Sequence, residues 1–148
     1  MVSLVLVAHS QRLLDALVEM VTETVSGSPA CHAAGGTDDG RLGTSLRLVV
    51  DACRAALSGG SDGALVLYDA GSAWLTIELA LDELSNDERD RIHVSHAPLV
   101  EGTLAAAARG ASGGDLPEMA EAAGQALASD KQPGRIDMPF GDAVRRTA

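Results

Sequence analysis

The chain has very few aromatic side chains, with one Trp, one Tyr and one Phe among 148 residues. So little aromatic surface leaves no platform on which the bases of a single-stranded nucleic acid would stack. Leu, Val, Ile and Ala must fill the interior instead, as is usual for a parallel sheet covered by helices. Hydrophobic residues make up 46% of the sequence, which is enough for one domain with one core.

Positive charge is also scarce. Lys131 is the only lysine, and the formal net charge of the chain is −10. Residues 131–148 hold four basic and two acidic groups, so residues 1–130 carry a net charge of −12. A body this acidic repels nucleic acids and anionic membranes, and it suits a protein partner with a basic docking face.

Cysteines and long apolar runs are few. Cys31 and Cys53 are the only cysteines, and they lack the spacing of metal ligands. We therefore expect buried cysteines rather than a disulfide scaffold or a zinc site. No stretch approaches the ~18 apolar residues of a membrane span, and the initial apolar run lacks the features of a signal peptide. The sequence predicts a cytoplasmic protein.

Apolar runs of strand length alternate with amphipathic runs of helix length. Strands are expected at about 2–8, 29–34, 63–68 and 91–97, and helices at about 10–26, 44–58, 72–85, 99–110 and 115–129. Parallel strands need crossovers, and these are nearly always right-handed. The pattern predicts an α/β fold with a doubly wound, mainly parallel four-stranded sheet flanked by helices. Residues 130–148 are expected to form a flexible tail or an edge strand.

The first predicted strand leads directly to a histidine. His9 follows the apolar run 2–8, and Ser10 is a suitable N-cap for the next helix. Ligands of open α/β sheets gather beyond the carboxyl ends of the strands, where free N–H groups at helix starts favour anions. His9 is therefore a candidate nucleophile and Ser10 a candidate phosphate-binding residue. The alternative is a histidine without a chemical role.

A glycine-rich polar loop follows the second predicted strand, at residues 35–45. Glycines such as Gly43 allow the backbone to approach a ligand closely, and Thr44 or Ser45 is placed to cap the next helix. The loop is not a phosphate-binding Walker loop, because it lacks the Gly-Lys-Ser/Thr ending. An ordinary surface loop is the alternative.

The third predicted strand ends in a second polar group, Asp69. Strands one and three are neighbours in the common sheet orders, so Asp69 and His9 are expected to meet. A carboxylate bonded to one imidazole nitrogen leaves the lone pair of the other free and stabilises positive charge on the ring. Gly71 permits close approach, and Ser72 offers a donor to an oxyanion. The alternative is that Asp69 only caps the helix that follows.

Two further histidines lie near the fourth predicted strand. His93 and His96 share its spacing, but no third ligand accompanies them. Partly exposed histidines are expected here rather than a metal site.

Four segments together resemble a known family. They are LVLVAHS at 4–10, GGTDDGRLGTS at 35–45, LYDAGSAWLTIELALDEL at 67–84 and APLVEGTLAAAARGASGGDL at 97–116. In this order and spacing they are similar to DhaM, the phosphotransferase subunit of the phosphoenolpyruvate (PEP)-dependent dihydroxyacetone kinases, built on a mannose-type IIA domain of the bacterial sugar phosphotransferase system (PTS). The resemblance covers about residues 1–129, which implies one EIIA mannose-type domain followed by the tail at 130–148.

The resemblance implies a phosphotransferase that works through a phosphohistidine. His9 would accept a phosphoryl group from the carrier protein HPr and donate it to ADP bound to the partner subunit DhaL, which acts with DhaK on dihydroxyacetone. Asp69 would orient His9, while Ser72, Gly43 and Thr44 would line the phosphate site. The implied assembly is a homodimer, and the implied cofactors, ADP and Mg²⁺, belong to DhaL rather than to this chain.

Two other functions remain open from the sequence. One is a IIA subunit of a mannose-type sugar transporter, although the APLVEGTLA segment favours the dihydroxyacetone branch. The other is a non-enzymatic module that binds an anion or reports phosphorylation, in which anion binding would survive the loss of His9.

Overall fold

In a computed structural model of the protein, residues 1–128 form an α/β fold built on one sheet. The four strands all run parallel, in the order β2-β1-β3-β4. The predicted α/β fold and the adjacency of strands one and three are confirmed. The strands are β1 (Val2–Ala8), β2 (Cys31–Gly35), β3 (Gly63–Tyr68) and β4 (Ile92–Val94), and the helices are α1 (Gln11–Thr24), α2 (Leu46–Leu57), α3 (Gly71–Asp82), α4 (Asn86–Arg89), α5 (Leu99–Ala111) and α6 (Leu116–Gln125).

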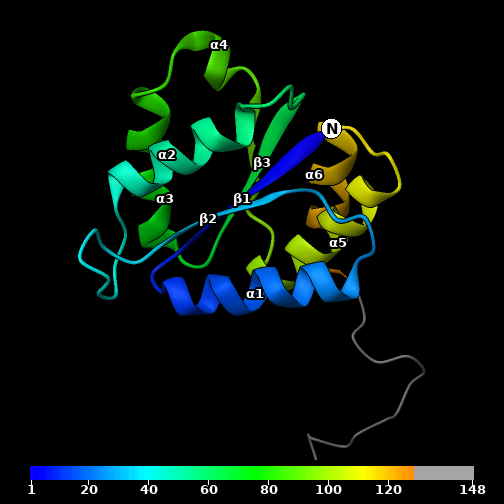
Figure 1. The fold of residues 1–148 in the computed structure, drawn as a ribbon, viewed down its shortest axis with the longest axis horizontal. Helices are drawn as coiled ribbons and strands as arrows, with labels where there is room; N and C mark the ends of the chain where they lie inside the picture. The colour runs from blue at the N-terminus through cyan, green and yellow to red at the C-terminus, as the bar shows by residue number, and fades with distance from the viewer. Residues whose placement is uncertain (129–148) are drawn as a thin grey trace, which may run out of the picture.

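Helices cover both faces of the sheet (Figure 1). Strand β1 is buried along its whole length, and alternate residues point to opposite faces. Leu4 and Leu6 pack with α1, α5 and α6, while Val5 and Val7 pack with α2 and α3. The two central strands, apolar except for Ser3 and Tyr68, thus supply two cores at once, which is the reason they do not alternate regularly with polar residues.

Side-chain caps mark the starts of α1, α2, α4 and α6, whereas α3 and α5 have none. Ser10 accepts from the backbone N–H of Leu13, and Ser45, the second of the two residues expected to cap α2, accepts from that of Leu48. Asp115 and Glu118 form a reciprocal capping box at α6. These caps place the first turns of α1 and α2 at the carboxyl edge of the sheet, beside the ends of β1 and β2.

The structure differs from the predicted elements at the fourth strand and just before it. Strand β4 is paired only over Ile92–Val94, shorter than the expected 91–97, because the parallel pairing ends where the chain turns toward α5. The short helix α4 was not expected, since four residues are too few to show an apolar period. The predicted tail at 130–148 lies outside the described residues. Within residues 1–128, no helix combines the length and apolarity of a membrane span.

Candidate active site

His9 is the first residue after β1 and directly precedes the cap residue of α1. It therefore lies at the carboxyl edge of the sheet, as expected. Its side chain is 32% exposed, so the ring is held by neighbours on most sides and still open to solvent. A side chain that reacts with a second protein needs both a fixed orientation and contact with solvent.

Asp69 follows β3, the neighbour of β1, and its carboxylate reaches the histidine. The Oδ1 and Oδ2 atoms of Asp69 lie 3.0 and 3.1 Å from His9 Nδ1. Oδ2 also accepts from the backbone N–H of His9 at 2.9 Å. Ala70, and not Asp69, is the N-cap residue of α3, so the alternative in which Asp69 only caps this helix does not hold.

These contacts decide which imidazole nitrogen holds the proton in the neutral ring. A carboxylate only accepts hydrogen bonds, so Nδ1 must be the donor, and the lone pair remains on Nε2. The side chain of Asp69 is only 19% exposed, which limits competition from water for this interaction. The carboxylate thus orients the ring and leaves the lone pair of Nε2 available.

Ser72 lies on the other side of the imidazole ring. Its Oγ is 2.8 Å from His9 Nε2, at a distance where the hydroxyl donates to the nitrogen lone pair. Ser72 is the second residue of α3, after Gly71, and the space around Gly71 is open: a Cβ there would meet no atom within 4 Å. The start of α3 therefore offers a hydroxyl and uncrowded backbone to a group attached at Nε2.

The glycine-rich loop is attached to the histidine through the backbone. The N–H of Gly43 donates to the carbonyl oxygen of His9 at 3.0 Å. Thr44 Oγ1 lies 2.6 Å from Thr76 Oγ1 of α3, so its hydroxyl links the loop to that helix. The structure thus brings Gly43 to His9 and assigns Thr44 a hydrogen bond to α3 rather than to the imidazole.

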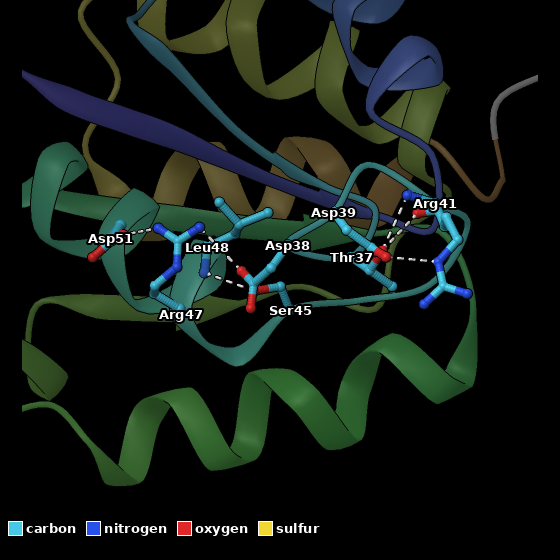
Figure 2. Close-up of polar contacts among 8 residues, drawn as sticks. All are labelled: Thr37, Asp38, Asp39, Arg41, Ser45, Arg47, Leu48 and Asp51. Carbon is cyan, nitrogen blue, oxygen red and sulfur yellow. Dashed lines mark hydrogen bonds and ion pairs between the residues drawn. The ribbon is translucent and has the colours of Figure 1, made fainter.

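A set of polar contacts organises the rest of this loop (Figure 2). The Thr37 hydroxyl donates to Asp39, and the same hydroxyl accepts from the backbone N–H of Arg41 at 3.0 Å. The hydrogen bond from Thr37 is the main cause that holds the pKa of the Asp39 carboxyl below its usual value. At the start of α2, Arg47 forms ion pairs with Asp38 and with a second carboxylate one turn further on. The loop is therefore an ordered structure and not only a glycine hinge.

Sequence reasoning missed Gln11 and Thr76. The side chain of Gln11 accepts from the backbone N–H of Gly35 at 2.9 Å and so joins the start of α1 to the end of β2. Thr76 receives the loop through Thr44. Gln11 lies just outside the quoted segments, and Thr76 lies inside the one at 67–84 without an expected role. Only a place after a strand end, or on the first turns of α3, would have indicated a role for them.

The other expected residues lie apart from the imidazole contacts. The Ser10 hydroxyl caps α1, as noted above. His96 Nδ1 lies 2.6 Å from the hydroxyl of Tyr68, and its ring packs edge-on against Trp74. His93 is exposed on β4. Among residues 1–128, no three His, Cys, Asp or Glu side chains are grouped as metal ligands.

The cysteines are free, and Cys53 is buried while Cys31 is partly buried. Burial raises the pKa of both thiols to about 11, so both are protonated at neutral pH.

The structure thus brings a histidine and a carboxylate together at the strand ends of a parallel sheet. The family described as PTS system fructose IIA component, EIIA-man, matches residues 3–121, and the chain belongs to this family. A solved crystal structure of a protein of unknown function is similar with a TM-score of 0.77 and 32% identity, covering 91% of this chain and all of that one.

Curated relatives narrow the resemblance to DhaM. The phosphoryl donor subunit DhaM of PEP-dependent dihydroxyacetone kinase 2 from Listeria innocua is 39% identical over 107 residues, which are 72% of this chain and 84% of the relative. The DhaM subunit from Escherichia coli is 35% identical over 145 residues, 96% of this chain. The chain spans only 30% of that longer relative. The predicted resemblance to DhaM subunits is confirmed.

Proposed function

We propose that this protein is a phosphoryl carrier that accepts a phosphoryl group on His9 from phospho-HPr and donates it to ADP bound to DhaL, for the phosphorylation of dihydroxyacetone. The observation that carries the proposal is the arrangement around His9, with Asp69 at Nδ1 and Ser72 at Nε2. The DhaM relatives support the choice of the dihydroxyacetone branch over a mannose-type sugar transporter.

In the loading step, the Nε2 lone pair of His9 attacks the phosphorus of the donor phosphohistidine in line. A bond forms between phosphorus and Nε2, the bond to the donor nitrogen breaks, and its electron pair stays on the donor ring. The proton on Nδ1 remains in its hydrogen bond to Asp69, whose negative charge stabilises the positive charge that develops on the ring of His9.

Ser72 acts at the phosphoryl group. Before transfer its hydroxyl donates to Nε2, and after transfer that electron pair is used in the new bond. The hydroxyl then turns to a phosphoryl oxygen and, with free N–H groups at the start of α3, meets the charge on the equatorial oxygens. The Ser72 hydroxyl therefore makes a stronger hydrogen bond to the charged phosphoryl group than to the neutral imidazole, and this difference stabilises the transferring group.

The partners follow from the same proposal. HPr is the donor, DhaL with DhaK is the acceptor, and ADP with Mg²⁺ belongs to DhaL. The chain acts as a homodimer in the cytoplasm. Light scattering of the purified chain, giving twice or once its 15.1 kDa mass, tests the dimer directly.

Incubation with PEP, enzyme I and HPr tests the function, with intact mass as the readout. We expect a gain of about 80 Da, one phosphoryl group, that is lost in His9→Ala. His93→Ala, which removes an exposed histidine of β4, is the matched control and keeps the gain. Label that survives in His9→Ala, or no label on the wild-type chain, contradicts the proposal. A labelled chain that cannot sustain dihydroxyacetone phosphorylation with cognate DhaK and DhaL points to the sugar-transporter branch instead.

A further inference from the structure

Arg12 differs from every other arginine in the described part of the chain. Residues 1–128 contain seven arginines, and six of them donate to a carboxylate or a carbonyl oxygen. Arg12 alone makes no ion pair or hydrogen bond with these residues. In a body with so large an excess of acidic groups, a cation left without a carboxylate is unexpected.

The position of Arg12 is also locally unfavourable. It is the second residue of α1, in a first turn that contains no acidic residue. The N-terminal end of a helix carries partial positive charge, so a cation there is disfavoured and an anion is favoured. Residues that break such a local rule are concentrated at functional sites, where a ligand supplies the missing interaction.

A cavity of about 360 Å³ lies beside Arg12. A second arginine, Arg41 of the glycine-rich loop, contributes to it, and the complete lining is Ser10, Gln11, Arg12, Gly40, Arg41 and Leu42. The Nε atom of Arg41 donates to Asp39 (Figure 2). Its terminal nitrogens have no hydrogen-bond partner among residues 1–128. Ser10, which lines this cavity, is the next residue after His9 in the chain, although His9 is not itself one of the lining residues.

We propose that this cavity, lined by Arg12 and Arg41, binds the diphosphate of the nucleoside diphosphate that accepts the phosphoryl group from His9, an inference that rests on the proposed function. Guanidinium groups pair with phosphate oxygens through two parallel hydrogen bonds. Two of them offset the negative charge that an incoming diphosphate would otherwise bring toward an acidic surface. The lining has no aromatic side chain and one large apolar residue, Leu42, which suits phosphates rather than a base.

The cavity acts in the delivery step. The bond between phosphorus and His9 Nε2 breaks as an oxygen of the terminal phosphate forms its bond to phosphorus, and the electron pair of the P–N bond returns to Nε2. Arg12 and Arg41 hold the attacking phosphate and reduce its repulsion from the phosphoryl group. In the loading step the donor is a phosphohistidine and no diphosphate is present, so the two arginines are not required.

Separate measurement of loading and delivery tests the inference. We expect Arg12→Gln to be loaded by phospho-HPr within about threefold of the wild-type rate and to deliver to nucleoside diphosphate on the acceptor at least tenfold more slowly. Arg12→Lys keeps the charge without the paired hydrogen bonds, so its delivery rate is expected to lie between those of the wild type and Arg12→Gln. Arg109→Gln is the control, because it makes the same charge change on α5, where the arginine pairs with Glu118.

Each other outcome has a definite meaning. Delivery by Arg12→Gln at the wild-type rate overturns the inference, whereas a wild-type chain that is never loaded overturns the proposed function. Equal slowing of loading and delivery also overturns the inference, because Arg12 would then act on the phosphoryl group or on docking in general. Arg12→Gln can also bind the acceptor protein more weakly by the same factor whether or not the acceptor holds its nucleotide. That result overturns the inference, because a protein carboxylate and not the diphosphate would then occupy the cavity.

A binding measurement that needs no partner protein completes the test. Pyrophosphate added to the unphosphorylated chain is expected to shift the NMR signals of the Arg12 and Arg41 Nε–H groups and of the Gly40 amide. In the double variant Arg12→Gln with Arg41→Gln, which has neither arginine signal, we expect the shift of the Gly40 amide to disappear. In Arg109→Gln we expect all three shifts to persist. Pyrophosphate that leaves these signals unmoved in the wild-type chain contradicts the inference.

Discussion

At the scale of single residues, the site depends on Asp69 more than on any other neighbour of His9. Its carboxylate makes hydrogen bonds to both the ring and the backbone N–H of the histidine. It therefore sets the orientation of the imidazole and the nitrogen on which the proton resides. A substitution that removes the charge of Asp69 and preserves its shape separates its effect on the imidazole from its effect on packing.

Asp69→Asn is expected to lower the rate of phosphoryl uptake on the order of 10²- to 10⁴-fold, with the fold unchanged. The amide can donate to Nδ1, which then becomes the acceptor, and the proton moves to Nε2, the atom that must attack. Single-turnover uptake from phospho-HPr measures the rate, and ¹⁵N NMR of the ring reports the tautomer. A variant with the proton still on Nδ1 and the wild-type rate contradicts this role.

The sequence predicted the meeting of His9 and Asp69 because both follow apolar strands, and the edge where such strands end is determined by topology. The hydrogen bonds from the Gly35 N–H to Gln11 and between the hydroxyls of Thr44 and Thr76 were not predicted, since they depend on side-chain rotamers across a loop. Topology can be inferred from pattern, whereas rotamers need the folded surroundings.

At the scale of elements, the close approach of β2 and α1 holds the histidine in place. A Cβ at Gly35 would lie 2.5 Å from the Cα of Gln11, inside the backbone of α1. Only glycine therefore lets the end of β2 reach the helix that follows His9. The glycine at 35 is a packing requirement rather than a source of flexibility.

Gly35→Ala is expected to destabilise the protein by about 1–3 kcal/mol, the usual cost of overpacking a rigid contact. Gly71→Ala is the matched control, because the added methyl meets open space in the first turn of α3, and it is expected to be neutral or to stabilise by up to ~1 kcal/mol. Urea denaturation measures both. Equal stability of the two variants would show that β2 and α1 can separate at no cost.

The glycine-rich loop has a pH dependence with a definite sign. The pKa of the Asp39 carboxyl is lowered, first by the Thr37 hydroxyl. A lowered folded-state pKa means that the ionised carboxylate stabilises the loop at every pH above its ordinary pKa of 3.8. That contribution is lost as the pH falls through the lowered value, so the loop is expected to rearrange only in acid.

Thr37→Val is expected to raise the pKa of Asp39 toward its ordinary value, because it removes the largest cause of the shift. Carbon NMR titration of the Asp39 carboxyl gives the midpoint. Thr44→Val is the control, since the hydroxyl of Thr44 bonds to Thr76 instead. Identical midpoints in the wild type and Thr37→Val would rule out this hydrogen bond as the cause.

Most elements were predictable at this scale, and the exceptions have physical causes. The buried strands and amphipathic helices have periods that sequence shows directly. Helix α4 has no buried residue and is defined by the Ser85–Glu88 capping box alone. Strand β4 lies at the sheet edge, where only one side is paired, so hydrophobic pattern overestimates its length.

At the scale of the whole molecule, the fold follows from few choices. Alternation of strands and helices with right-handed crossovers leaves a small set of sheet orders, and in the common ones strands one and three are adjacent. One sheet edge then receives the ends of all strands, which is why His9, Asp69 and the glycine-rich loop converge. Residues 1–130 carry a net charge of −12, so the molecule that presents this edge is strongly acidic as a whole.

The proposed exchange of a phosphoryl group between this acidic chain and a partner with a basic docking face is expected to depend on salt. Uptake from HPr under second-order conditions should slow as ionic strength rises from about 0.01 to 0.15 M, because the screening length falls from about 30 to 8 Å. Glu78→Lys, at an exposed position of α3, the helix that also carries Ser72, should slow uptake and flatten the salt dependence. Glu23→Lys makes the same charge change at the far end of α1 and should leave both nearly unchanged. Equal effects of the two variants would mean that net charge alone steers the encounter, whereas a rate insensitive to salt would mean that the acidic surface has no part in it.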